Sequence, residues 1–219
     1  MQRVLEPEVM DSWEEAVAYD AMDFTQVNAA FAQRAIELAP TIAKVLDMGT
    51  GTARIPLLLS QQRPQWQITG IDLAENMLKI GAEHIKKAGL QQQIILELVD
   101  AKKLPYPNEH FDLVISNSLF HHLPDPLPFL QEIKRVLKLQ GAILIRDLIR
   151  PVNQEILDTL VESIGTEYDA HQKQLFADSL HAAFTLDEVN QLISQVGLQG
   201  VKLYQSSDRH WTAERSFGG

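Results

Sequence analysis

Two glycines separated by one residue form the strongest chemical signal in the sequence. Gly49-Thr50-Gly51 directly follows the short apolar run Val45-Leu46 and precedes a helical pattern through Ile55. Glycines at such a strand-to-helix turn let a ligand approach the backbone and meet amide groups at the helix N-terminus. The third glycine of a dinucleotide fingerprint is replaced by Arg54, so the loop taken alone is weak evidence for a nucleotide site.

Two acidic residues at later strand ends add to this signal. Asp72 closes a second apolar run about twenty residues after the glycines, where a carboxylate accepts both hydroxyls of a ribose. Asp100, followed by Ala101, closes a third run. Because the carboxyl ends of parallel strands line one crevice, we expect the three segments to converge on one elongated ligand. The alternatives are that Asp72 caps the helix starting near Ala74 and that Asp100 is a solvated loop residue.

A histidine pair follows the fourth predicted strand. His121 and His122 are the candidate catalytic residues, since histidine is the first choice as a base for an acceptor that must lose a proton. The alternative is that one ring packs and the other is solvated. Asp147 ends the fifth predicted strand and is expected to face the same cleft, with Arg146 on the opposite side of the strand, or to belong to a buried ion pair.

Alternating patterns predict the elements that position these residues. Strands are expected at 45–46, 67–71, 94–99, 111–115, 142–145, 201–204 and 210–212. Helical stripes lie between them, at 24–38, 55–60, 77–88 and 127–137. Asp125 is the expected N-cap of the last of these helices, with Pro126 at its first position. Strand and helix in repeated alternation predict an α/β fold, a doubly wound, mostly parallel sheet with helices on both faces.

The alternation breaks after Arg150-Pro151. Two helical stripes, 152–164 and 171–182, precede a capping box that begins at Thr185 and opens a helix ending at Gly197. We therefore predict a single domain in four parts: an N-terminal helical lid at 1–40, a cofactor-binding core at 41–150, a helical insertion at 151–184 that serves as a small cap, and a final helix with strands at 185–219.

Composition limits the classes of function. The 219 residues are 45% apolar, enough for one sizeable core, and the absence of cysteine excludes disulfides, thiolate metal sites and a cysteine nucleophile. No metal site is predicted, because His171, His181 and His210 lack ligand-like spacing. A net charge of −10 disfavours nucleic acid as partner. With no bilayer-length apolar run, and with acids and a proline in residues 1–8, a cytoplasmic location without a membrane span is expected.

Four ordered segments carry a resemblance to a known family. They are 45–52 (VLDMGTGT), 70–78 (GIDLAENML), Asp100-Ala101 and 111–123 (FDLVISNSLFHHL). The set resembles the successive motifs of class I S-adenosylmethionine-dependent methyltransferases, most closely the small-molecule group that includes the ubiquinone/menaquinone-type C-methyltransferases. The resemblance covers Lys44 to Asp147, roughly half of the chain. In one departure, Leu139-Gln140-Gly141 replaces a turn that in this family often has a proline and two glycines.

The resemblance implies a Rossmann-like seven-stranded sheet, S-adenosylmethionine as cofactor and S-adenosylhomocysteine as product. The cofactor-binding positions it implies are Asp47, Gly49, Thr50, Gly51, Asp72, Leu73, Met77, Asp100, Ala101 and Asn117. Gly49 and Gly51 would let the backbone pass the methionine part, with Asp47 beneath the loop holding its amino group directly or through the turn. Asp72 would take the ribose hydroxyls.

The remaining implied contacts surround the adenine and the methionine. Leu73 and Met77 would flank the adenine ring, Asp100 and the Ala101 amide would read its edge, and Asn117 would lie beside the methionine group. The implied activity is methyl transfer to a small organic acceptor. Two alternatives stay open: an NAD-dependent oxidoreductase on a related sheet, and a non-catalytic S-adenosylmethionine-binding module. The sequence predicts neither the acceptor nor the oligomeric state.

Certain acceptors are disfavoured. Enzymes that methylate exocyclic amines of bases carry two prolines after the fourth strand, which Asn117-Ser118-Leu119-Phe120 lacks, and enzymes that attack carbon 5 of pyrimidines need a cysteine. Methyl transfer from a sulfonium needs no protein nucleophile, because the leaving group is already activated and alignment supplies most of the catalysis.

Overall fold

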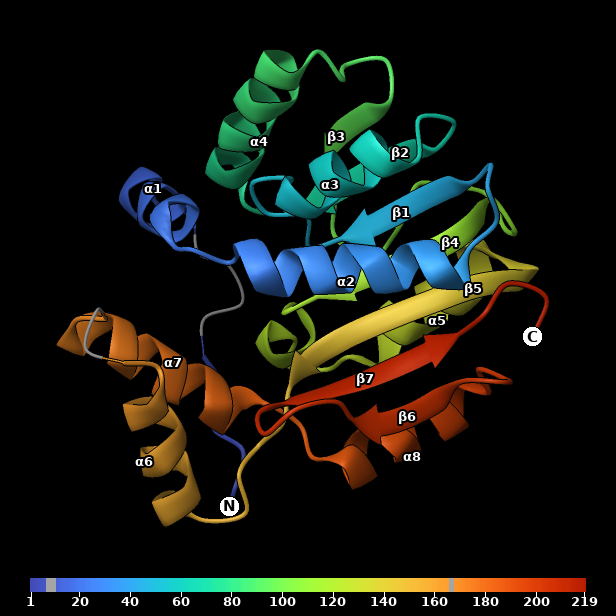
Figure 1. The fold of residues 1–219 in the computed structure, drawn as a ribbon. Helices are drawn as coiled ribbons and strands as arrows, with labels where there is room; N and C mark the ends of the chain where they lie inside the picture. Colours follow the sequence, from blue (N-terminus) through green and yellow to red (C-terminus); the bar gives the residue numbers. More distant parts are fainter. Residues whose placement is uncertain (7–10, 166–167) are drawn as a thin grey trace.

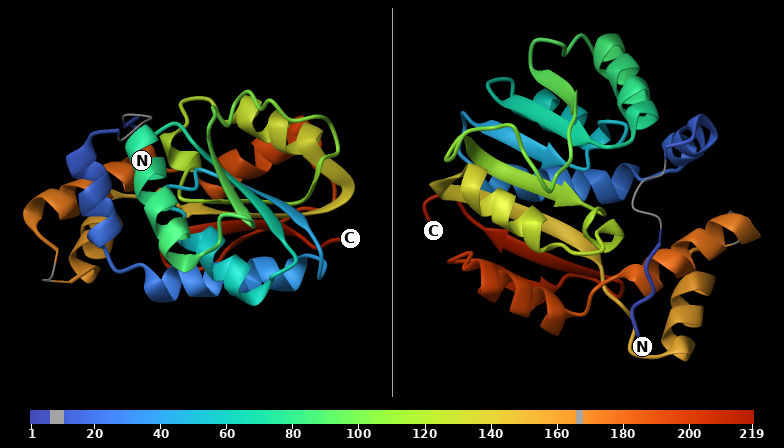
Figure 2. Two further views of the ribbon diagram at one scale, coloured as in Figure 1. Left: turned by 90° about the horizontal axis from the view of Figure 1, so that it is seen from above. Right: turned by 180° about the vertical axis from the view of Figure 1, so that it is seen from behind.

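A seven-stranded sheet, in the order β3-β2-β1-β4-β5-β7-β6, lies between two layers of helices (Figures 1 and 2). The computed structural model describes residues 1–6, 11–165 and 168–219. The strands are β1 (Lys44–Met48), β2 (Gln67–Asp72), β3 (Ile94–Leu98), β4 (Phe111–Asn117), β5 (Leu137–Leu148), β6 (Lys202–Gln205) and β7 (His210–Arg215). Neighbouring strands from β3 to β5 are parallel, and β7 is antiparallel to both β5 and β6. This confirms the predicted Rossmann-like, mostly parallel sheet.

Helices cover both faces of the sheet. One face carries α2 (Thr25–Leu38), α3 (Arg54–Gln62) and α4 (Glu75–Ala88), and the other carries α5 (Leu127–Val136) and α8 (Leu186–Val196). The remaining helices lie toward the carboxyl ends of the parallel strands, at the left of Figure 1: α1 (Trp13–Ala21), α6 (Gln154–Ser163), α7 (Ala170–Ala182) and the short η1 (Phe120–His122). Among the described residues, none of these helices combines the length and hydropathy that crossing a bilayer requires.

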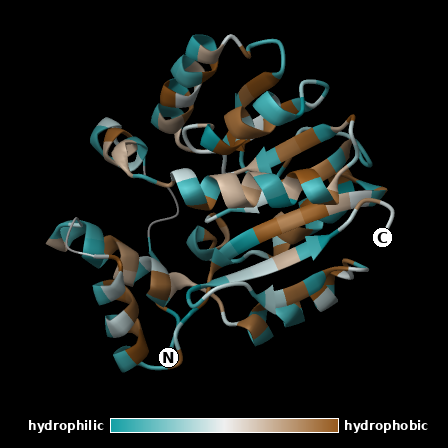
Figure 3. Ribbon diagram, in the orientation of Figure 1, coloured by the Kyte–Doolittle hydropathy of each residue, from teal (hydrophilic) through white to brown (hydrophobic). Residues whose placement is uncertain are grey.

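The core has two main parts, one on each side of the sheet. In β1, Val45 packs toward α2 and α3 while its neighbour Leu46 packs toward α5 and α8, as strand alternation dictates. Both side chains are fully buried. The central strands are therefore apolar on both faces, visible as the brown band in Figure 3, which is what a sheet covered on both sides requires.

Three elements differ from the sequence-based expectation. β5 begins at Leu137, directly after α5, and its pairing with β4 shifts register between Phe111 and Leu113, so the turn expected at 139–141 lies inside the strand as an irregularity. Asp125 is not the N-cap of α5: its carboxylate accepts the amide of Leu127 two residues on, and the helix begins one residue later than expected.

The third difference concerns the predicted N-terminal lid. Helix α2 does not cover a cleft but packs on the sheet, because its stripe of Phe31, Ala35 and Leu38 is buried against the strands. Of the two helices described in residues 11–40, α1 is the one that lies beside the carboxyl ends of the strands (Figure 1).

Removal of a core side chain from the central strand tests this arrangement. Leu46→Ala is expected to lower the free energy of unfolding by about 2–5 kcal/mol, since it leaves a cavity in a fully buried layer. Leu139→Ala is the matched control, because Leu139 is 83% exposed. Urea denaturation followed by circular dichroism measures both. Equal effects of the two substitutions would contradict the packing described.

Candidate functional site

A cleft opens where the parallel strands end, and α1 forms one of its walls. It holds about 800 Å³ of non-protein space, part of it open to solvent. Eight of the ten predicted cofactor positions line it: Gly49, Gly51, Asp72, Leu73, Met77, Asp100, Ala101 and Asn117. They come from the ends of four different strands, so the structure brings together segments that are far apart in the sequence.

The glycine turn after β1 brings the backbone close to its neighbours. Gly49 has a φ of +78°, a conformation that favours glycine, and a Cβ added there would lie 2.9 Å from the Cβ of Leu119. The amides of Gly49 and Thr50 both donate to the carbonyl of Ile71 at 2.9 Å. The turn is thus fixed to the end of β2, with its open side facing the cleft.

Asp72 connects two backbone segments at the centre of the cleft. One carboxylate oxygen accepts the amide of Gly51 at 2.8 Å, and the other accepts the amide of Ala74 at 2.9 Å. Burial raises the pKa of Asp72, and these two amide hydrogen bonds oppose that rise. Asp72 is therefore not the N-cap of α4, which is Ala74, but its carboxylate fixes the turn before the helix and forms part of the cleft wall.

The two other predicted positions, Asp47 and Thr50, lie beneath the turn and do not line the cleft. The Thr50 hydroxyl donates to Asp47 at 2.7 Å, and Asp47 is only 2% exposed. Burial and the negative charge of Asp72 raise the pKa of Asp47, the Thr50 hydrogen bond lowers it, and the net result is a pKa of about 7. Asp47 is therefore a carboxyl group that titrates near neutral pH below the glycine turn.

Arg54, which replaces the third glycine, fastens α1 to the cleft. Its guanidinium Nε lies 3.1 Å from the carboxylate of Asp20, which is also 2.9 Å from Nε2 of His84 on α4. Beside Asp20, Tyr19 lines the cleft, and burial raises the pKa of its phenol to about 12. Tyr19 falls within the predicted lid at 1–40, but its contact with the cleft was not predicted. The capping box of Ser12 and Glu15, which opens α1, is the signal that would have located it.

The structure places His121 and His122 in different surroundings. His122 lines the cleft, whereas His121 is buried on the short η1 turn, with its Nδ1 2.5 Å from Asp147. Burial lowers the pKa of His121, but the charges of Asp147 and Glu6 outweigh it and the net effect is a raised pKa. Arg146 lies on the other side of β5, as expected, where it donates to Asn117 at 2.9 Å.

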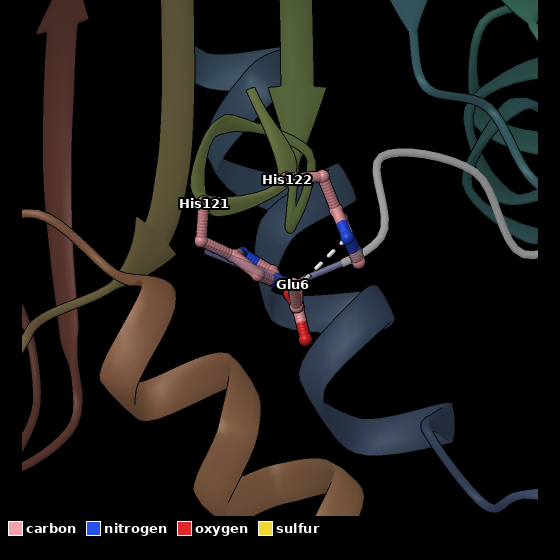
Figure 4. Close-up of side chains that lie close together, drawn as sticks. All are labelled: Glu6, His121 and His122. Carbon is pink, nitrogen blue, oxygen red and sulfur yellow. Dashed lines mark ion pairs between the residues drawn. The ribbon is translucent and has the colours of Figure 1, made fainter. Parts of the chain in front are cut away.

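Sequence reasoning missed Glu6, whose carboxylate lies against both histidines (Figure 4). It also missed Leu119 and Leu123, which add apolar wall to the cleft. Nothing in the local pattern around Glu6 indicates this contact, since 115 or more residues separate it from its partners along the chain.

The chain is similar in sequence to known methyltransferases. Residues 42–211 match the family described as "Methyltransferase domain". The demethylmenaquinone methyltransferase of Listeria welshimeri is 36% identical over 110 residues, which are 49% of this chain and 45% of that protein. A protein of the same name from Thermotoga maritima is 27% identical over 185 residues, 79% of this chain and 78% of the other. The chain spans about half the length of the Listeria relative that it matches.

Solved structures share the fold. A SAM-dependent methyltransferase from Aquifex aeolicus superimposes with a TM-score of 0.68 at 19% identity, covering 95% of this chain and all of that one. A putative S-adenosyl-L-methionine-dependent methyltransferase from Methanococcus maripaludis gives 0.73 at 16% identity, covering 97% of each chain.

The buried carboxyl group of Asp47 predicts a pH-dependent stability. Its pKa of about 7 in the fold exceeds the ordinary value of 3.8, so the native state binds the proton more tightly than the unfolded chain does. The ionised group therefore destabilises the fold above about pH 7, and this penalty disappears as the pH falls below about 4. Asp47→Asn keeps an acceptor for the Thr50 hydroxyl and is expected to raise the free energy of unfolding at pH 8 by about 2–4 kcal/mol.

Urea denaturation at pH 8 and pH 5 measures this effect, and we expect the gain to shrink to roughly half or less at pH 5. Asp158→Asn, on the exposed side of α6, is the matched control and should show no such gain. A gain that does not depend on pH, or a loss of stability at pH 8, would show that Asp47 is ionised at little cost in the native state.

Proposed function

The chain belongs to the class I S-adenosylmethionine-dependent methyltransferase family, and from this premise we propose that it binds S-adenosylmethionine in the cleft and transfers the methyl group to a small organic acceptor. The observation that carries the proposal is the convergence of the glycine turn, Asp72, Asp100 and Asn117 on one cleft at the strand ends. The names of the relatives, which include a 27-O-demethylrifamycin SV methyltransferase from Amycolatopsis mediterranei that is 27% identical over 157 residues, support an acceptor of this class.

The cleft fits the proposed cofactor on its own geometry. The missing side chain of Gly49 lets Leu119 pack against the turn, and a Cβ added at Gly51 would have the ring of Tyr19 as its nearest neighbour, at 3.8 Å. The Gly51 amide is held toward Asp72. We infer that Asp72 receives the ribose hydroxyls and that Leu73 and Met77 enclose the adenine. Asp47 would act through the turn above it, where its negative charge favours a cationic ammonium group.

When bound, S-adenosylmethionine supplies an activated methyl group on a sulfonium. The chain's own residues then have to align the acceptor and exclude water. Tyr19 and Leu119 line the cleft and limit access of water to it. His122, on the same wall, is proposed as the base for an acceptor that must lose a proton, while His121 is proposed to position the turn through its contact with Asp147.

The proposal includes a cytoplasmic location and excludes nucleic acid as the acceptor. The net charge of −10 supports the second point, because a phosphate backbone is bound mainly through cationic side chains.

Calorimetric titration with S-adenosylhomocysteine tests the cofactor assignment. We expect one saturable site in the wild type and an affinity about 10- to 100-fold lower in Asp72→Ala, since hydrogen bonds to a charged carboxylate are worth about 1.5–3 kcal/mol. Asp158→Ala is the matched control on the exposed side of α6. Thermal unfolding without ligand shows whether each variant is folded.

The same titration with NADH distinguishes the oxidoreductase alternative. Saturable binding of NADH without binding of S-adenosylhomocysteine would overturn the proposal. Equal affinity of the Asp72→Ala and Asp158→Ala variants would show that the ligand binds elsewhere. Transfer of labelled methyl groups to small-molecule pools would then separate an enzyme from a binding module.

A further inference from the structure

Three side chains that could ligate a metal ion meet beside the cleft (Figure 4). Oε1 of Glu6 lies 3.3 Å from Nε2 of His121 and 3.1 Å from Nδ1 of His122, and the three atoms all lie within 4.8 Å of one another. The side chains are 11%, 5% and 18% exposed, respectively. Two imidazoles and one carboxylate are a ligand set that zinc sites use.

The hydrogen bond at the far side of His121 fixes which nitrogen faces the cluster. Nδ1 lies 2.5 Å from Asp147, so this nitrogen donates its proton to the carboxylate. In a neutral ring the lone pair is then on Nε2, the nitrogen nearest to Glu6. A carboxylate that orients a histidine through its other ring nitrogen is the outer shell typical of metal-binding histidines.

The Oε1 atom of Glu6 has the two imidazoles as its ionisable neighbours, but no hydrogen bond within the described part of the chain satisfies it. One oxygen accepts the hydroxyl of Ser179 at 3.1 Å, but Oε1 is buried and accepts no hydrogen bond from any residue that the structure describes. A buried carboxylate oxygen beside two imidazole nitrogens is costly unless a positive charge balances it, either a proton on an imidazole or a bound metal ion.

The spacing suits a metal ion. Ligand atoms about 2.0–2.2 Å from Zn²⁺ are separated by roughly 3.0–3.5 Å at right-angled to tetrahedral geometry. The two separations from Glu6, 3.1 and 3.3 Å, fall in this range, and the two imidazole nitrogens lie within 4.8 Å of each other.

The backbone that presents Glu6 is anchored by contacts other than the cluster. Arg3 donates to the carbonyls of His121 and Leu123 at 3.0 and 2.8 Å, and its guanidinium lies 3.7 Å from the ring centroid of Phe184. We call residues 1–6 the N-terminal strap. Because the strap is held against the turn that carries the histidines, its carboxylate is preorganised toward them.

We propose that Glu6, His121 and His122 bind a first-row divalent metal ion of the Zn²⁺ class, with Asp147 as the residue that orients His121. Three protein ligands leave one position of a tetrahedral ion for water or an oxygen atom of the acceptor. His122 is also part of the cleft wall, so the ion would lie at the boundary between the strap and the cleft. With the ion bound, His122 would be a ligand and could not act as the base proposed above, because its lone pair would be used in binding. The site stands on its own geometry and does not depend on the proposed cofactor.

The test is a calorimetric titration of the full chain with Zn²⁺ after removal of metals by chelation, without S-adenosylmethionine or its product. We expect one saturable site, with affinity at least tenfold lower in Glu6→Gln and in His122→Ala. His171→Ala, which removes an exposed imidazole from α7, is the matched control and should bind as the wild type does. Titration with Co²⁺ should add a visible absorption band that is lost in Glu6→Gln.

Absence of saturable Zn²⁺ binding in the wild type would overturn the proposal, as would equal affinity in Glu6→Gln and the wild type. Glu6→Gln preserves the size of the side chain, and thermal unfolding checks that the variant is folded. S-adenosylhomocysteine binding is measured separately, so a failure of the metal site and a failure of the proposed cofactor site give different results.

Discussion

The cleft depends on one carboxylate, that of Asp72. It receives an amide from the turn after β1 and another from the start of α4, and so joins two loops that the parallel sheet brings to the same edge. This arrangement buries the carboxylate of Asp72 close to the second buried carboxyl group, that of Asp47, which is unfavourable when both are ionised. Burial raises the pKa of both groups. A ligand that brings hydroxyl groups and positive charge to this position relieves that cost. Electrostatics and backbone geometry therefore favour the same class of ligand.

Two arginine side chains, Arg54 and Arg3, hold the N-terminal part of the chain against the site. Arg54 holds Asp20, and through it α1 and Tyr19, against the cleft, while Arg3 holds the strap against the histidine turn. The first anchor explains why a bulky residue occupies the position at which a dinucleotide fingerprint has its third glycine.

The sequence predicted the sheet and most of the cleft because both follow from local rules. Apolar runs mark buried strands, and acidic residues at the carboxyl ends of parallel strands meet at one edge of the sheet. These two rules predicted that Asp72 and Asp100 lie in the same cleft, as the structure shows. The early start of β5 was missed because it depends on a register shift against β4. Glu6 was missed because its contacts join distant parts of the chain. Only coordinates show that the adjacent rings of His121 and His122 lie in different surroundings.

The most direct measurement is a crystal structure of the protein crystallised with S-adenosylhomocysteine. We expect both ribose hydroxyls within hydrogen-bond distance of Asp72, the amino-acid part beside the turn at 49–51, and the adenine between Leu73 and Met77. A nucleoside bound outside this cleft, or bound within it without contact to Asp72, would contradict the assignment of the cleft as the cofactor site.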